Sequence, residues 1–370
     1  MHVISFTEPV EVARGFKLAP GMYLADNVNA GDWLGKHSHQ ARVHGCPELP
    51  PWSPSARRVC VVRPGGLGDL VMLTAVFRAM ARVAPEAKLT VCTYPWNAPV
   101  LDGLPYVHEV IDYPLPKHRW MDFDAVVGLD DLLERHAEPA KVHALDALLQ
   151  AFPGLVVEDR RPDYCTDSVE RMRAAESWPR PKTKPGGLVI GLQLQASAKA
   201  RTYPRCPELI KLLVNRGHGV RIFGEPGRKH VQHDFGPRVH DLPSGEPCGR
   251  APSFRESVAI AQDCDVLIAP DSSLVHIAGA LGIPCVALYG SFEAHTRMAY
   301  YPSVHALQGR RPCAPCCWHS RTGHWPTKHP GAECVSANTC TALAQIDPGQ
   351  IARRAEKLAT EPNKLRDEPS

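Results

Sequence analysis

Short apolar runs alternate along most of the chain with stretches in which apolar residues recur at helical spacing. In the first part of the chain, buried strands are predicted by the runs at 58–63, 88–94, 107–113 and 124–130, and a helix is predicted over 69–85. Strands that alternate with helices are typical of a parallel sheet covered on both faces. The pattern therefore predicts an α/β domain over residues 58–175.

The same alternation restarts after the proline-rich, basic stretch 177–187, which we interpret as an interdomain linker. Strands are predicted at 188–194, 219–224, 265–270 and 284–290, with helices at 206–217, 254–264 and 272–282. We expect a second α/β domain over residues 186–350. Open α/β sheets bind ligands beyond the carboxyl ends of their strands, so two such domains predict an interdomain cleft.

Residues 1–50 differ from both domains, because they hold two short β-prone runs around turn residues and end in a proline-rich linker. They predict a small β-rich module. No apolar run reaches the roughly 18 residues of a transmembrane helix, and the start of the sequence lacks the features of a signal peptide. A cytoplasmic location without a membrane span is the expectation. The net charge of +3 indicates no particular partner.

Three glycines and one acid, Gly65, Gly66, Gly68 and Asp69, lie between the first predicted strand and its helix. Glycine allows a tight turn and close approach of the backbone to a ligand. The loop has neither the G-x-G-x-x-G nor the G-K-[ST] pattern of dinucleotide and P-loop sites. From spacing alone, Asp69 either caps the helix and interacts with its dipole or is a general base.

A second loop, in the later domain, places Asp271, Ser272 and Ser273 between a buried strand and a helix of small residues. Backbone N–H groups, hydroxyls and the helix dipole would converge there, which suits a phosphate or pyrophosphate. The alternative is an ordinary N-cap by Asp271 or Ser272. His276, one turn further along, is either a satisfied helix histidine or a contact to the same anion.

The loop at 194–204 carries Lys199 and Arg201, and no acid occurs between Glu176 and Glu208. A cationic loop beside an anion site would neutralise a pyrophosphate, whereas the alternative is a solvated surface loop.

Five cysteines gather in the segment 313–340. The C-x-x-C pair has the spacing of a zinc site that the two later cysteines could complete, although the second pair is spaced loosely. A structural zinc ion, a disulfide and free thiols all remain open. The four candidate ligands are Cys313, Cys316, Cys334 and Cys340.

These motifs, in this order, resemble glycosyltransferase family 9, the ADP-heptose:lipopolysaccharide heptosyltransferase-like enzymes. PGGLGDLV at 64–71 is similar to the family's first loop, and SAKARTYP at 197–204 is similar to its basic loop. FGEPGRKH at 223–230 offers Glu225. DSSLVHIAGALGIP at 271–284 is the most specific of the motifs, and the resemblance covers about residues 58–305.

The resemblance implies a GT-B fold, with two Rossmann-like doubly wound domains and an interdomain cleft. It implies an inverting, metal-independent transfer of a heptose or hexose from an ADP- or UDP-type nucleotide sugar. Asp69 would then be the base, and Gly65, Gly66 and Gly68 would clear space for the acceptor. The implied donor-binding residues are Lys199, Arg201, Glu225, Asp271, Ser272, Ser273 and His276.

The acceptor remains open at this stage. A glycan such as a lipopolysaccharide core is one interpretation. Basic residues interleaved with aromatic ones between Glu293 and Glu333 also suit nucleic acid, so a hydroxylated base in DNA is an alternative acceptor. A non-catalytic nucleotide-sugar-binding protein is a third interpretation.

Overall fold

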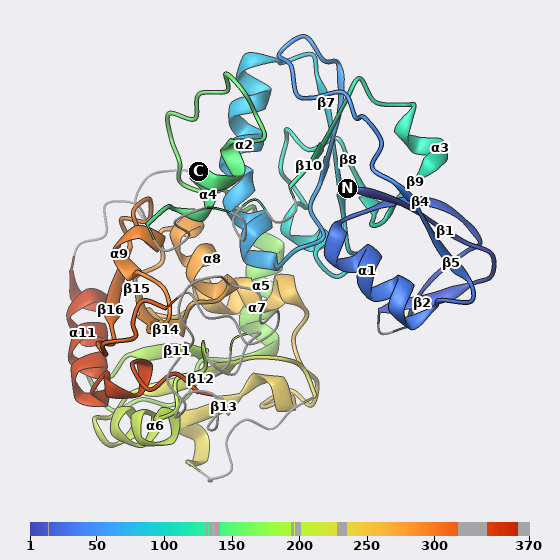
Figure 1. The fold of residues 1–370 in the computed structure, drawn as a ribbon. Coiled ribbons are helices and arrows are strands. Elements are labelled where there is room, and N and C mark those ends of the chain that lie inside the picture. The colour runs from blue at the N-terminus through green and yellow to red at the C-terminus, as the bar shows by residue number, and fades with distance from the viewer. Residues whose placement is uncertain are drawn as a thin grey trace. The chain divides into compact units, whose positions relative to one another are not determined.

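The computed structural model describes residues 1–13, 15–129, 132, 136, 141–193, 196, 201–227, 235–316 and 339–361. The chain forms two compact units, the first made of Met1–His136 with Leu145–Arg160 and the second of Ala137–Ala144 with Arg161–Ser370. Figure 1 shows both units as mixtures of helices and strands. Among the described residues, no helix has both the length and the apolar character needed to cross a membrane.

The first unit contains a four-stranded parallel sheet in the order β10-β6-β7-β8. Its strands are β6 (Arg58–Val62), β7 (Lys88–Thr93), β8 (Glu109–Asp112) and β10 (Ala125–Gly128). Helix α2 (Leu67–Val83) connects β6 to β7, and ten consecutive or nearly consecutive residues of it are buried. The apolar runs therefore predicted these strands and this helix correctly.

The N-terminal segment adds a second, antiparallel sheet in the order β5-β1-β4-β9. Its strands are β1 (His2–Phe6), β4 (Gly21–Ala25), β5 (Ala41–Gly45) and β9 (Leu115–Pro116). A hairpin of β2 (Val10–Ala13) and β3 (Phe16–Leu18) and the helix α1 (Asn27–Lys36) complete the segment. The two β-prone runs did not predict α1, which the Asp26 side chain caps by accepting from Asn29 N–H.

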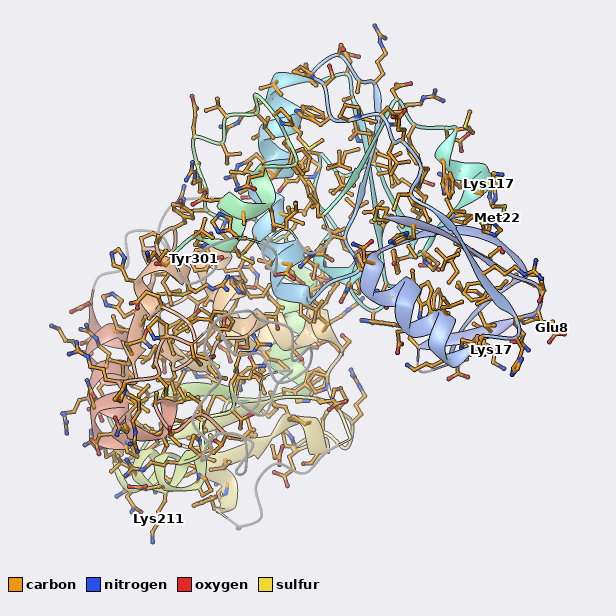
Figure 2. The ribbon with its side chains drawn as sticks, in the orientation of Figure 1. Glu8, Lys17, Met22, Lys117, Lys211 and Tyr301 are labelled. Atoms are coloured by element: carbon orange, nitrogen blue, oxygen red, sulfur yellow. The ribbon has the colours of Figure 1, made fainter. Side chains whose placement is uncertain are left out.

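This segment and the parallel sheet share one hydrophobic core. Ile4, Leu24 and Trp33 from the segment pack in the same cluster as Val62 and Tyr113. Strand β9, which belongs to the later part of the unit, pairs with β4. Next to it, Lys117 of α3 (Lys117–Trp120) reaches Met22, with 3.7 Å between Nζ and Sδ (Figure 2). Residues 1–45 are thus built into the first unit.

The second unit has a six-stranded parallel sheet in the order β13-β12-β11-β14-β15-β16. This is the Rossmann order, in which the strand sequence reverses between β11 and β14. The strands are β11 (Val189–Gln193), β12 (Gly219–Phe223), β13 (Val239–Asp241), β14 (Val266–Pro270), β15 (Cys285–Tyr289) and β16 (Val304–Gln308).

The helices of this unit are α5 (Ser168–Ser177), α6 (Cys206–Asn215), α7 (Phe254–Gln262), α8 (Ser273–Leu281), α9 (Ala294–Arg297) and α11 (Pro348–Thr360). The helices predicted at 206–217, 254–264 and 272–282 are present as α6, α7 and α8, whereas α5, α9 and α11 were not predicted. One face of the sheet packs against α6 and α11 in a single hydrophobic cluster. Gly282 ends α8 in the left-handed conformation, with φ of 65°. Helix α4 (Ala144–Leu149) belongs, except for its first residue, to the first unit.

The stretch 177–187, interpreted from its composition as a linker, lies within the second unit. Arg180 pairs there with Asp263 at 3.1 Å and with Asp265 at 2.8 Å. The positive charge of Arg180 therefore forms ion pairs within the second unit.

Candidate functional site

The first candidate loop follows β6 and is organised by a buried arginine that the sequence analysis missed. The Arg63 side chain is only 8% exposed, and its Nη2 donates to Oδ2 of Asp69 at 2.7 Å. Its Nη1 donates to the backbone oxygen of Leu129, just after β10, at 2.6 Å. Strands β6 and β10 are neighbours where the strand order of this sheet reverses, which is the usual ligand-binding position in such sheets.

Asp69 lies in the first turn of α2 and does not cap it. The N-cap residue is Gly66, whose backbone oxygen accepts from Asp69 N–H at 3.0 Å, so the capping interpretation was wrong. The Asp69 side chain keeps 26% of its surface exposed. Its negative charge is favourable at the positive end of the helix. The fold thus holds an oriented, partly accessible carboxylate at this strand end.

The glycines of this loop have distinct surroundings. A Cβ on Gly65 would lie 2.6 Å from Nε of Arg63, so this glycine makes room for the guanidinium. Gly66 is exposed, and the nearest atom to a Cβ there would be Oδ2 of Asp69 at 3.9 Å. Gly68 is a residue of α2 itself. The buried Asn97 fastens the loop by donating to the backbone oxygen of Gly65 at 2.8 Å.

The second candidate site brings together the loop that follows β11 and the loop that follows β14, two neighbouring strands on either side of the strand reversal. Nη1 of Arg201 donates to the backbone oxygen of Asp271 at 3.1 Å and lies 3.3 Å from its Oδ2. The Tyr289 hydroxyl, at the end of β15, donates to Oδ1 at 3.4 Å. The structure therefore brings together two predicted site residues that are 70 positions apart. Tyr289 was not foreseen.

The Asp271 side chain is mostly buried, with 13% of its surface exposed. Burial by itself raises the pKa of this carboxyl, but Arg201, Arg297 and His276 oppose that effect and bring the pKa below its ordinary value. A mostly buried carboxylate paired with Arg201 is a structural element of the loop. It balances part of the positive charge that the loop would present to an anion.

Ser272 occupies the N-cap position of α8, but its hydroxyl turns to the neighbouring strand. It donates to Oε1 of Gln193, the last residue of β11, at 2.8 Å. Within the described part of the chain, this hydroxyl makes no capping hydrogen bond to α8. Ser273 is the first helical residue. Ser272 is therefore the N-cap residue that the ordinary interpretation named, but its side chain links β11 to the start of α8 instead of capping the helix.

His276 is buried inside α8, and its Nδ1 lies 2.7 Å from the Tyr301 hydroxyl. The two rings meet edge to face at 5.6 Å. A Cβ on Gly279 would lie 2.7 Å from the same tyrosine ring, so the small residues of α8 make room for Tyr301. One ring nitrogen of His276 is thus engaged by a tyrosine that the sequence motif did not indicate.

The remaining predicted residues are dispersed. Glu225 is exposed, two residues after the end of β12. Lys199 and Cys334 lie outside the described residues. Among the residues that are described, no group of three or more His, Cys, Asp or Glu side chains could hold a metal ion. The buried Cys340 accepts instead from Leu343 N–H, at 3.4 Å, while Cys313 is half-buried and Cys316 buried.

Two Rossmann-like units, each with a polar loop where its strand order reverses, are the architecture of the GT-B fold, which the solved structures reported below share. Residues 122–325 match the family model of glycosyltransferase family 9 (heptosyltransferase). The match spans more than half of the chain, which therefore belongs to glycosyltransferase family 9.

Among curated relatives, lipopolysaccharide heptosyltransferase 2 of Salmonella typhimurium is 24% identical over an alignment of 293 residues, and the match covers 63% of this chain and 82% of the relative. The enzyme of the same name from Escherichia coli is 24% identical over 299 residues, with the same two coverages. These relatives align with most of their own length to this chain.

Solved structures share the fold. E. coli ADP-heptose lipopolysaccharide heptosyltransferase II superposes with a TM-score of 0.58 at 17% identity, covering 82% of this chain and 98% of that one. A family 9 glycosyltransferase from Veillonella parvula gives 0.60 at 17% identity, with coverages of 84% and 99%. The iron-containing dodecameric glycosyltransferase TibC of enterotoxigenic E. coli gives 0.55 at 14% identity, with coverages of 96% and 90%.

Proposed function

We propose that this glycosyltransferase moves a heptose from ADP-heptose to a hydroxyl of a lipopolysaccharide-core glycan, with inversion at the anomeric carbon and without a catalytic metal ion. The names of the relatives support the heptose donor and the lipopolysaccharide acceptor. The observation that carries the chemistry is the Asp69 carboxylate, held at 2.7 Å by the buried Arg63 yet still a quarter exposed. None of the relatives reported above is described as acting on DNA.

In this proposal Asp69 is the general base. The acceptor oxygen attacks the anomeric carbon, the bond from that carbon to the diphosphate oxygen breaks, and the acceptor proton passes to Asp69. Attack opposite the leaving diphosphate inverts the configuration. A positioned base contributes roughly 10²–10⁴-fold to such a step. Arg63 is a positioning residue, because it fixes the carboxylate through the ion pair and is itself fixed by Leu129.

The loop after β14 is proposed to stabilise the departing ADP. The N-terminus of α8 offers backbone N–H groups and a favourable dipole, and the mostly buried Arg201 adds a cation. We keep Ser272, Ser273 and His276 as donor contacts at this helix. We also keep Lys199 and Glu225 as proposed donor contacts from the neighbouring loops.

These positive groups supply the charge stabilisation that a metal ion gives in other glycosyltransferases, which is why we propose metal-independent catalysis. Any bound metal is then structural. Of the four cysteines predicted as ligands, the three that the structure describes, Cys313, Cys316 and Cys340, do not form a group that could hold a metal ion. The name of the iron-containing TibC makes iron as well as zinc a metal to measure. Elemental analysis of the purified protein, with and without EDTA treatment, tests the assignment. Loss of transfer on removal of an exchangeable Mg²⁺ or Mn²⁺ would contradict metal-independent chemistry.

The reaction itself is tested with purified protein, ADP-heptose and a lipopolysaccharide core oligosaccharide freed of its acyl chains. We expect release of ADP that depends on the oligosaccharide. With a β-linked donor, NMR of the product should show an α-linked heptose. A β-linked product would overturn the inverting mechanism, and transfer from UDP-sugars alone would overturn the donor assignment.

A further inference from the structure

An exposed tryptophan stands beside the Asp69 loop without a role in the proposed chemistry. Trp96 follows the carboxyl end of β7 and is 49% exposed. Its ring stacks on Tyr94, with centroids 4.4 Å apart and planes inclined by only 13°. One face of the indole is therefore supported by protein. We name Phe16, Tyr94 and Trp96 the aromatic platform.

The N-terminal segment holds this platform rigid. Phe16 of β3 packs edge-on against Tyr94 at 6.3 Å and against Trp96 at 6.4 Å. The hydroxyl of the buried Tyr94 donates to Oδ1 of Asn29 in α1 at 3.1 Å. Tyr113 meets Tyr94 edge to face at 5.2 Å. An exposed aromatic ring with this much support loses little conformational entropy when a ligand binds.

A direct link joins the platform to the loop of the proposed base. Asn97 comes immediately after Trp96 and is buried. Its Nδ2 donates to the backbone oxygens of Pro64 at 3.2 Å and Gly65 at 2.8 Å. Strands β6 and β7 are parallel neighbours, so the loops that follow them leave the same edge of the sheet. The platform therefore lies at the sheet edge that also carries Asp69.

We propose that the aromatic platform is an acceptor subsite that stacks one sugar ring of the glycan on Trp96, next to the hydroxyl that reacts at Asp69. This inference rests on the proposed function. The C–H face of a saccharide ring buries apolar surface on an aromatic face, and the indole N–H can donate to a hydroxyl. Positioning the acceptor gives the N-terminal segment a role in catalysis, through Phe16 and Asn29.

The test compares Trp96→Ala with wild type in direct binding. The probe is a panel of bacterial core oligosaccharides free of acyl chains, measured by calorimetry, together with the change in tryptophan fluorescence. We expect roughly tenfold weaker oligosaccharide binding, as loss of stacking and burial on one aromatic ring predicts. The acceptor KM should rise by a similar factor, with an unchanged KM for ADP-heptose. Trp96→Phe should restore most of the affinity.

Two controls separate this inference from the proposed chemistry. Met121→Ala removes another exposed apolar side chain of the same unit, 86% exposed, and should bind as wild type does. Asp69→Asn should lose turnover but keep oligosaccharide binding, so failure of the base assignment leaves the platform testable. The platform is overturned if Trp96→Ala binds as wild type does or if no oligosaccharide binds wild type. Trp96-dependent binding of a single-stranded oligodeoxynucleotide in place of sugars would overturn the saccharide assignment.

Discussion

In the first unit the loop after β6 leads to Asp69, and in the second unit the loop after β14 begins at Asp271. Each loop lies where the strand order of its sheet reverses, and each pairs an aspartate with an arginine. In the first pair the arginine is the more buried partner and the carboxylate keeps the larger exposed fraction. In the second pair both side chains are mostly buried.

The two loops share an Asp–Arg ion pair at a strand end, but they differ in which charge is accessible to a ligand. At the first loop the buried Arg63 side chain donates to Leu129 O and to Asp69 Oδ2. The more accessible group of the pair is therefore the carboxylate of Asp69. At the second loop the carboxylate is enclosed by Arg201 and Tyr289, and the start of α8 follows directly. The first arrangement suits a base and the second suits an anion, so substitutions at the two loops should have different effects.

The largest expected effect is on turnover at the first loop. Asp69→Asn removes the proposed proton acceptor and should lower kcat by roughly 10²–10⁴-fold, with little change in ADP-heptose affinity. Steady-state kinetics and calorimetry check the two parts. Asp159→Asn is the matched control, since Asp159 is an arginine-paired acid of the same unit, and it should leave kcat unchanged. Unimpaired transfer by Asp69→Asn would remove Asp69 as the base.

At the second loop the expected effect is on donor binding. Arg201→Ala removes a cation from the proposed diphosphate site and should weaken ADP binding by about 10–100-fold, as expected for a charged hydrogen bond. Calorimetric titration with ADP measures this. Arg205→Ala, which removes a nearby arginine paired with Glu208, should bind ADP normally. Equal affinities for the two variants would contradict an anion site at Arg201.

Substitutions at two adjacent glycines test how tightly the first loop is packed. Gly65→Ala would push a methyl group against the buried guanidinium of Arg63, and we expect a loss of about 1–3 kcal/mol in unfolding free energy. Gly66→Ala has room and an ordinary backbone conformation, with φ of −67°, so its stability should stay close to wild type. Urea unfolding of both variants measures the difference. Equal losses would show that Arg63 does not fill the space at Gly65.

The smallest effect concerns pH and the buried acid of the second loop. The pKa of Asp271 is below its ordinary value of 3.8, so its carboxylate stabilises the folded state above that pH, and the stabilisation is lost as the pH falls through the folded-state pKa. Asp271→Asn keeps an acceptor for Arg201 and should cost about 0.5–1.5 kcal/mol at neutral pH. Thermal unfolding across the acidic range should show this difference narrowing below pH 3.8. A difference that widens there would contradict the lowered pKa.

Much of the fold could be predicted from the sequence, because buried parallel strands are continuous apolar runs and their helices repeat every three to four residues. The N-terminal helix α1 escaped prediction. Its few apolar residues give a weak helical pattern. The helix is stabilised by the Asp26 N-cap and by the packing of Trp33 in the core that it shares with the parallel sheet. The linker at 177–187 was assigned on composition, whereas Arg180 makes its ion pairs with residues more than 80 positions later.

The sequence by itself determined the two Rossmann-like patterns and the placing of Asp69 and Asp271 at strand ends, since both follow from local periodicity and local turn chemistry. Only the tertiary structure decided which group each loop presents. The partners that decide it, Leu129 for Arg63 at the first loop and Arg201 for Asp271 at the second, lie 66 and 70 positions away along the chain. Hydrogen bonds across such separations depend on which strands become neighbours, and no local pattern of residues specifies that.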